Sequence, residues 1–395
     1  MRICPHACRV RPIGARSVRI AGGFLLLVPL GYCLFSAPSP AGAVAPPLNG
    51  RIVFASDRSL NRDIFAMDPD GANVQQLTND PAVDDEPRWA PDGSQIAFQT
   101  RRDGNTEIYV MDSDGANETR LTFSAAADFS PAWSPDGTQI AFISDRDGNL
   151  EIHVMNADGT DTRRLTVDQD VPWPDLTPAW SPDGSLIAFA SDRDSPFPFA
   201  HWGVREIYTM TPEGQDITRL TDNLCDDAGP AWSPDGSRIA FFSICGDPRD
   251  LEPDFHHIYT MNADGTSAVQ LTNEPALDLS PAWSPDGTQI AFVTTREVNQ
   301  EIYVMSAEGS GATNITNNPY ADVSPDWQPL FYGDVNCRDW ANAIDASLVL
   351  QYAARLVSSL PCSDRGDVNE DGRLDSLDAS LILQHAAGLI DKLPA

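Results

Sequence analysis

The stretch Pro131-Ala132-Trp133-Ser134-Pro135-Asp136-Gly137 decides the fold, because it returns along the chain at a nearly constant spacing. Its copies centre on Trp89, Trp133, Trp180, Trp232 and Trp283, and a reduced copy centres on Trp327. These tryptophans lie 44, 47, 52, 51 and 44 residues apart. Repeats of this length that contain several short strands are typical of β-propeller blades. A single repeat cannot bury both faces of its sheet, so we expect each one to stack on its neighbours.

Each repeat has the pattern of four antiparallel strands, which we name A to D in chain order. In one copy, strand A ends at Trp133 and is followed by apolar runs at 139–142, 151–155 and 164–166, with Asp-Gly turns between them. Alternating apolar runs separated by such turns predict a four-stranded meander. Asp-rich stretches such as 68–71 recur at the predicted hairpin tips, where Asp and Gly suit the backbone geometry, so we interpret them as turns rather than calcium sites.

The two ends of the repeat region are incomplete in a complementary way. The first copy supplies only strands B, C and D (52–54, 63–65 and 76–78), and the last copy, 322–329, supplies only strand A. If both ends build one blade, the ring closes and no sheet edge at the seam stays exposed. The sequence therefore predicts a mainly β fold: a six-bladed propeller closed by the two ends of its repeat region.

These phrases resemble the WD40-like repeats called PD40, which occur in the propeller domain of TolB and related secreted proteins. The resemblance covers residues 49–330 and implies a TolB-like six-bladed propeller. Unlike TolB itself, no separate domain is expected before the propeller, so the role of TolB in the cell envelope is not expected to transfer.

The first 43 residues differ from the rest. They hold five arginines and no acidic residue, then an apolar run at 20–35, then Ala41-Gly42-Ala43. This order predicts a signal peptide, residues 1–43, followed by a short linker, 44–48. An uncleaved anchor is the less favoured alternative, because the apolar run is short and interrupted. We expect a secreted or cell-surface protein with no transmembrane segment in the mature chain.

Charge and cysteine content limit the partners and the compartment. The chain has 26 basic and 57 acidic residues, and loss of the five leader arginines would change the net charge from −31 to about −36. Such an excess disfavours nucleic acid and favours cations or basic partners. Four of the seven cysteines lie beyond the leader, and in an oxidising compartment they predict the disulfides Cys225–Cys245 and Cys337–Cys362.

A repeated acidic position precedes each tryptophan by five residues: Asp84, Asp128, Asp175, Asp227, Asp278 and Asp322. In five repeats an arginine lies four residues after the strand-B phenylalanine: Arg58, Arg102, Arg146, Arg193 and Arg296. Within an A–B hairpin these positions nearly face each other, which favours a repeated cross-strand ion pair. The alternative is an acidic ring at the mouth of the central channel that holds a cation. The repeat without the arginine has Cys245 in its place, with Cys225 opposite.

The longest departures from the repeat gather on one face, where the B–C and D–A connections meet. They contribute the candidate binding residues Trp173, Phe197, Phe199, His201, Trp202, Phe255, His256 and His257. Exposed aromatic side chains on a rigid scaffold are typical of a binding surface for a protein or a glycan. The alternative is that these loops pack on one another and have only a structural role.

Residues 331–395 form a different module with an internal repeat at an offset of 33 residues. Its second loop places Asp367, Asn369, Asp371, Arg373, Asp375 and Asp378 at EF-hand positions 1, 3, 5, 7, 9 and 12, where the backbone carbonyl of position 7 is the ligand. In the first loop Asp334, Asn336, Asn342 and Asp345 hold positions 1, 3, 9 and 12, but Arg338 at position 5 cannot bind calcium. We predict calcium as the cofactor, and we expect the first site to be weaker, rearranged around Asp339, or empty.

Two loop–helix repeats at a C-terminus resemble a type I dockerin, a small α-helical module that binds cohesin domains. The resemblance covers residues 333–392 and implies a cohesin-type partner, within a polysaccharide-degrading or cell-surface assembly. Positions 10 and 11 of the loops, where well-known dockerins often have a Ser-Thr pair, are Ala343-Ile344 and Ser376-Leu377.

The sequence thus favours a secreted, non-catalytic binding protein. The alternative is a propeller enzyme of lyase or glycosidase type, with His201, His256 and His257 near the channel mouth. No Gly-x-Ser-x-Gly nucleophile motif is present to support it.

Overall fold

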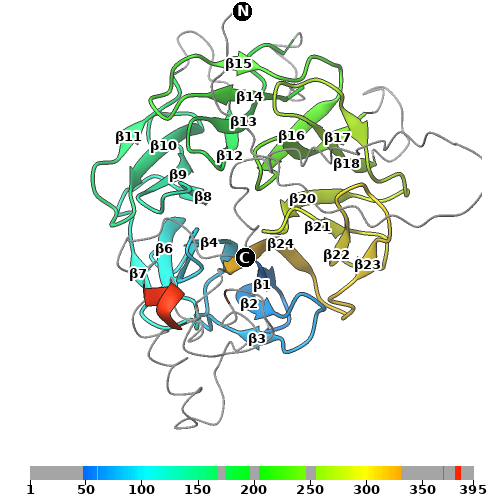
Figure 1. Cartoon of the computed structure of the whole chain (residues 1–395). Helices are drawn as coiled ribbons and strands as arrows, with labels where there is room; N and C mark the ends of the chain where they lie inside the picture. Colours follow the sequence, from blue (N-terminus) through cyan, green and yellow to red (C-terminus); the bar gives the residue numbers. More distant parts are fainter. Residues whose placement is uncertain are drawn as a thin grey trace, which may run out of the picture. The chain divides into compact units, whose positions relative to one another are not determined.

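The computed structural model describes residues 48–59, 61–167, 174–195, 204–245 and 255–330, together with Val368 and residues 379–383. Within residues 48–330 it contains six four-stranded antiparallel sheets arranged around a common centre (Figure 1). The innermost strands are β24, β4, β8, β12, β16 and β20. The predicted six-bladed propeller is therefore confirmed.

We number the blades along the chain. Blade 1 contains β24 (Asp322–Leu330), β1 (Leu48–Ser56), β2 (Asp63–Met67) and β3 (Gln75–Gln76). Blade 2 contains β4 (Asp84–Trp89), β5 (Gln95–Thr100), β6 (Glu107–Asp112) and β7 (Thr119–Arg120). Blade 3 contains β8 (Asp128–Trp133), β9 (Gln139–Ser144), β10 (Glu151–Asn156) and β11 (Arg163–Arg164).

Blade 4 contains β12 (Asp175–Trp180), β13 (Ile187–Ser191), β14 (Glu206–Met210) and β15 (Thr218–Arg219). Blade 5 contains β16 (Asp226–Trp232), β17 (Arg238–Ile244), β18 (His256–Asn262) and β19 (Val269–Gln270). Blade 6 contains β20 (Asp278–Trp283), β21 (Gln289–Thr294), β22 (Glu301–Ser306) and β23 (Thr313–Asn314).

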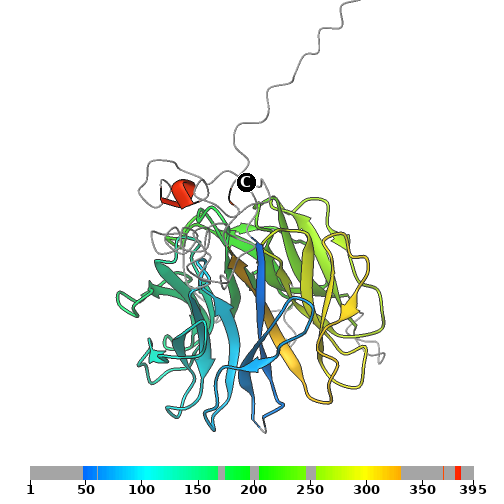
Figure 2. The ribbon, with the colours of Figure 1, turned by 60° about the horizontal axis from the view of Figure 1, so that its bottom comes forward.

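The ring closes in blade 1, where both ends of the repeat region meet. Strand β24 pairs antiparallel with β1, from Leu48 opposite Leu330 to Ser56 opposite Asp322, and the two strands lie side by side in Figures 1 and 2. Gln328 donates a hydrogen bond to the carbonyl of Gly93 in blade 2 at 2.9 Å. On the other side, the amide of Asp286 in blade 6 donates to the Asn49 side chain at 3.1 Å. The closing strands are therefore tied to the A–B turns of both neighbours.

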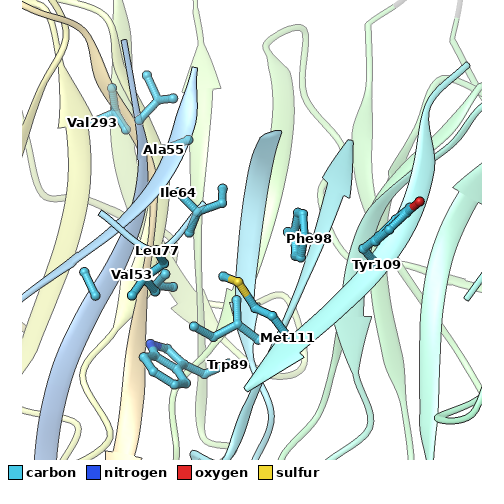
Figure 3. Packing of buried hydrophobic residues seen from close by; sticks show 12 residues of the cluster. Val53, Ala55, Ile64, Leu77, Trp89, Phe98, Tyr109, Met111 and Val293 are labelled. Atoms are coloured by element: carbon cyan, nitrogen blue, oxygen red, sulfur yellow. The ribbon is translucent and has the colours of Figure 1, made fainter. Parts of the chain in front are cut away.

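The hydrophobic core lies between the blades rather than within one sheet. Strands B and C are almost wholly buried on both faces in every blade except blade 5, which fits their continuous apolar runs. Six clusters of buried side chains each join neighbouring blades. Figure 3 shows one of them, in which Ile64 and Leu77 of blade 1 pack beside Trp89, Phe98 and Met111 of blade 2. No blade can bury its faces alone, so the ring is the folding unit.

The C–D turns also connect neighbouring blades. Gly71 has a φ of +84°, and a Cβ atom at this position would lie 2.1 Å from the carbonyl oxygen of Ile315 in blade 6. Asp70 accepts a hydrogen bond from the amide of Ala72 inside the same turn. These Asp-Gly stretches are therefore turns that pack on the preceding blade.

The innermost strands share a feature that the sequence did not reveal. Each has a β-bulge whose central residue, three before the tryptophan, has a positive φ of 50–63°: Glu86, Ser130, Thr177, Gly229, Ser280 and Ser324. A bulge bends its strand and increases the local twist. The six bulges therefore curve the innermost strands around the central channel.

Residues 379–383 are helical, where the sequence predicts a helix after the second calcium loop. Among the residues that the structure describes, no helix has the length and apolar character needed to cross a bilayer.

Candidate functional site

The two faces of the ring are built from different connections. We call the face formed by the B–C and D–A connections the loop face, and the face formed by the A–B and C–D turns the turn face. Antiparallel pairing places each loop-face connection at the start of a strand A or strand C. Aspartates at the start of strand A therefore lie near the loop face.

Five blades contain the same buried ion pair at this level. Asp128 has no exposed surface, and both of its carboxylate oxygens accept hydrogen bonds from Arg146 Nη2, each at 2.9 Å. The Arg146 guanidinium also lies over the Phe142 ring, 5.5 Å from its centroid. The equivalent pairs are Arg58–Asp322, Arg102–Asp84, Arg193–Asp175 and Arg296–Asp278.

The strand register differs slightly from the expected one. Asp128 faces Ser144, and the arginine lies two residues beyond, so its side chain reaches back to the carboxylate. All six aspartates are fully buried. They do not form the open carboxylate ring that was the alternative interpretation, because five of them are neutralised by an arginine in the same blade.

Blade 5 replaces this ion pair with a disulfide. Cys225 and Cys245 are bonded, as predicted, and their Cα atoms lie 4.4 Å apart. Asp227 has Ser243 and Asn223 as its hydrogen-bond donors in place of an arginine. Burial raises the pKa of Asp227 to about 6, although these two hydrogen bonds act to lower it. Cys337 and Cys362 lie outside the described residues.

The raised pKa of Asp227 predicts a pH dependence of stability. The unfolded carboxyl releases its proton near pH 3.8 and the folded one near pH 6. Between these two pH values the folded protein keeps a proton that the unfolded chain has lost. The contribution of Asp227 to stability is therefore full below about pH 4 and is lost as the pH rises through 6. We expect this group to lower the free energy of unfolding by about 3 kcal/mol between pH 4 and pH 7.

Thermal melting of D227N at several pH values tests this expectation. The variant should be more stable than the wild type at pH 7 and should lack this part of the pH dependence. D128N is the matched control, because it leaves the Arg146 charge without its buried partner and should lower stability at pH 7. A D227N protein that is destabilised at pH 7 as much as D128N would contradict the raised pKa.

A second polar layer was not predicted. Four blades begin strand C with a buried glutamate. In three of them it accepts a hydrogen bond from a threonine that follows strand D, in the pairs Glu107–Thr122, Glu151–Thr166 and Glu301–Thr316, and in blade 4 Glu206 pairs with Arg219. A strand-D arginine 13 residues after the glutamate completes the pair in three blades. This constant spacing was visible in the sequence and could have revealed the pair.

The central channel is lined by the innermost strands of all six blades and encloses about 330 Å³. Most of its lining side chains are Ser, Pro, Ala and Trp, and its charged members are Glu86, Arg88 and Asp326 on neighbouring strands β4 and β24. Burial raises the pKa of Glu86 and raises that of Asp326 to about 6. The Asp326 carboxylate accepts a hydrogen bond from the amide of Trp89 at 2.7 Å, which joins blades 1 and 2.

The predicted aromatic binding residues are only partly described. Trp173, Phe197, Phe199, His201 and Trp202 lie outside the described residues. Phe255 is on the loop face with 37% of its surface exposed. His256 and His257 are not loop residues as expected, because Ile244 pairs with His256 and extends the hairpin beside the disulfide. His256 stacks on Phe242 with ring centroids 5.9 Å apart.

Exposed apolar side chains gather on the loop face. D–A connections from five blade junctions contribute Val83, Phe123, Val167, Leu224 and Tyr320, and B–C connections contribute Phe255 and Val298. Loop connections on a rigid ring are suited to binding because the scaffold fixes their positions. The described residues therefore support the loop face as the candidate binding surface.

The structure has six four-stranded blades around one channel, and strands from the two ends of the repeat region close the ring. The protein is therefore a six-bladed β-propeller. The family model for the TolB beta propeller domain, PD40, matches residues 36–129, 124–198 and 251–334, more than half of the chain, and the chain belongs to this family. A second family model, for the dockerin type I domain, matches residues 332–387.

Individual relatives match shorter stretches. A TolB homolog from Chlorobium luteolum is 29% identical over 134 residues, covering 25% of this chain and 31% of that protein. The Tol-Pal system protein TolB from Anaeromyxobacter dehalogenans is 47% identical over 55 residues, covering 14% of this chain and 11% of that protein. The chain thus spans about a third or less of the length of these relatives.

Solved structures extend the similarity in fold. TolB from Acinetobacter baumannii superposes with a TM-score of 0.60 at 24% identity, over 71% of this chain and 67% of that one. A chain of the nidogen/laminin complex superposes with a TM-score of 0.54 at 13% identity, over 70% of this chain and 98% of that one. At these identities the similarity concerns the fold alone.

Proposed function

We propose that this protein is a secreted, non-catalytic binding protein with two attachment points. The loop face of the propeller binds a protein or glycan partner, and the C-terminal dockerin segment binds a cohesin-type partner. The observation that carries this proposal is the combination of exposed apolar loops on one face of a closed ring with a dockerin match directly after the last strand.

Calcium is the cofactor we propose for the dockerin segment. Dockerin type I domains bind calcium, and the second loop supplies oxygen ligands at alternating positions beginning with Asp367. Both loops lie outside the described residues, so this assignment rests on their sequence. Calcium would neutralise the clustered carboxylates and allow the loop and its helix to fold. We place the protein in an extracellular or cell-surface assembly, of the kind that degrades polysaccharides.

Capture from the secreted and surface fraction of the source cells tests both attachment points. With calcium, the intact protein should retain a cohesin-type partner, and EGTA should release it. D367N should lose this partner, because it replaces the carboxylate ligand at position 1 of the stronger calcium loop. D334N, in the loop that Arg338 impairs, should lose much less. Equal capture with and without calcium would contradict the dockerin role.

The loop face is tested in the same experiment. Triple alanine substitution of Trp173, Trp202 and Phe255 should remove a second, calcium-independent partner. The matched control is triple alanine substitution of Val74, Ile217 and Val269, which are exposed apolar residues away from the loop face. If the partner still binds the first triple variant and no longer binds the second, the binding surface lies away from the loop face.

A further inference from the structure

The lining of the central channel departs from the repeat on one side only. Two positions of every innermost strand contribute to this lining: the bulge residue and the residue directly before the tryptophan. Blade 2 has Glu86 at the bulge, whereas the other blades have small residues there: Ser130, Thr177, Gly229, Ser280 and Ser324. Before the tryptophan, four blades have alanine, blade 2 has Arg88 and blade 1 has Asp326. The charged exceptions therefore all lie on the neighbouring strands β4 and β24.

These three charged residues are accessible from the channel. Glu86, Arg88 and Asp326 are each partly exposed, and all three line this open cavity of about 330 Å³. Small-molecule sites typically have volumes of about 300–1,000 Å³, so the channel is large enough for a small ligand. The small residues at the equivalent positions of the other blades do not fill this space.

The guanidinium of Arg88 uses little of its hydrogen-bonding capacity. It has five N–H donors, and among the described residues its only acceptor is the carbonyl of Pro87, which lies 2.9 Å from Nη1. Its Nε and Nη2 atoms therefore have no acceptor in that part of the chain. In blade 3, by contrast, Nη2 of Arg146 donates to both carboxylate oxygens of Asp128. Arg88 is thus an arginine on an open cavity with donors to spare.

Two carboxyl groups share the electrostatic influence of Arg88. Its positive charge acts to lower the pKa of Glu86 and that of Asp326, whereas neither carboxyl group changes the pKa of the other. Burial raises both pKa values, that of Asp326 to about 6, so Asp326 is mostly ionised at neutral pH. The Asp326 carboxylate also accepts a hydrogen bond from the amide of Trp89, which holds it beside β4. The channel thus offers one cation flanked by two acidic groups.

We propose that the central channel binds a small amino acid with a cationic side chain. The ligand carboxylate would accept hydrogen bonds from Arg88, because a guanidinium can bind a carboxylate through two parallel N–H donors. The α-ammonium group would lie at Asp326 and the cationic end of the ligand side chain at Glu86. Each of the three charges in the channel then meets its opposite. This site goes beyond the two proposed attachment points and depends on neither of them.

Occupants with only one sign of charge suit the channel less well. An inorganic anion bound at Arg88 would be repelled by the Asp326 carboxylate, and a metal ion bound at the carboxyl groups would be repelled by Arg88. An inserted chain end of a partner protein brings only one of the two terminal charges. A free amino acid carries both an ammonium group and a carboxylate on neighbouring atoms, so it avoids these repulsions.

Calorimetric titration of the full-length protein with L-lysine at neutral pH tests the proposal. Saturable binding is expected. Cadaverine, which lacks the carboxylate, and L-norleucine, which lacks the side-chain ammonium group, should each bind at least about tenfold more weakly. R88A should weaken the binding of L-lysine by at least about tenfold. Because four other blades have alanine at this position, the fold should tolerate the substitution.

Two further variants assign the contacts. E86S introduces the serine that three other blades have at the bulge, and it should remove the preference for L-lysine over L-norleucine. D326N keeps an acceptor for the Trp89 amide and should weaken the binding of both amino acids. R101A is the matched control, because it removes an exposed arginine of the same blade that does not line the channel, and it should leave binding unchanged.

Several results would overturn the proposal. These are absence of saturable L-lysine binding, equal binding of cadaverine or L-norleucine, or equal affinity for L-lysine in the wild type and R88A. Thermal melting of each variant must first show one cooperative transition, so that lost binding is not lost folding. If R88A does not melt cooperatively, D326N takes its place, and an unchanged affinity in D326N would then be the contradicting result.

Discussion

Replacement of Trp327 by alanine is expected to lower the free energy of unfolding by about 3–5 kcal/mol and to open the ring at its seam. Trp327 is 4% exposed and packs with Ile52, Phe65 and Met67 of the same blade and with Ile302 of blade 6. Because β24 is joined to the rest of blade 1 by pairing and packing alone, loss of this side chain weakens the closure itself.

The matched control is W283A. Trp283 occupies the same position in blade 6 and is 8% exposed, but its strand is followed directly by β21 of the same sheet. Chemical denaturation should show comparable losses of stability for both variants. Hydrogen exchange should then show faster exchange of the amides in β24 and β1 only for W327A. Equal exchange in the two variants would mean that the seam is no weaker than the other blades.

Reduction of the Cys225–Cys245 disulfide is expected to lower stability by about 3 kcal/mol. The cysteines are 20 residues apart, and a cross-link that closes a loop of this size restricts the unfolded chain by about that amount. Blade 5 has no arginine pair at this level with which to compensate. Denaturant unfolding with and without reductant measures the difference.

The other blades suggest a replacement for this disulfide. In blade 4, Arg193 lies over Phe189 and Tyr208, whose ring centroids are 5.7 Å apart at an interplanar angle of 26°. In blade 5, Phe241 and Tyr259 have the same separation and the same angle. The aromatic pair that would receive an arginine is therefore already formed.

The double variant C225A/C245R tests this reasoning. It should place a guanidinium on the aromatic pair and beside Asp227, restore the ion pair of the other blades and make stability independent of reductant. The single variant C225A, with neither disulfide nor arginine, is the control and should match the reduced wild type. A double variant no more stable than C225A would show that Asp227 and the aromatic pair do not accept an arginine.

The repeat made most of the fold predictable. Blade number, closure by the two ends of the repeat region and the Cys225–Cys245 bond all follow from phrases that recur at nearly constant spacing, because similar local sequence in each copy predicts similar strands and turns. The TolB-like family was likewise visible in these phrases, and the match of the family model confirms it.

The remaining features depend on contacts between strands, which one repeat does not reveal. The bulge residue is Ser, Thr, Gly or Glu in different blades, so no residue type identifies it; its position follows from fitting strand A to strand B. The sequence predicts a loop at His256 and His257, because the insertion before them hides the start of β18. The extended hairpin beside the disulfide brings both residues into the strand.

The position of Leu330 has a mechanical consequence. Strand β24 begins at the loop face and ends at the turn face, where Leu330 lies opposite Leu48. In the proposed arrangement, a tether would pull at Leu330 and a partner would be held at the loop face, at opposite ends of β24. Tension between a captured partner and such a tether would run along β24. Because the hydrogen bonds between β24 and β1 are perpendicular to the strands, this load would shear many of them together rather than peel them apart one at a time.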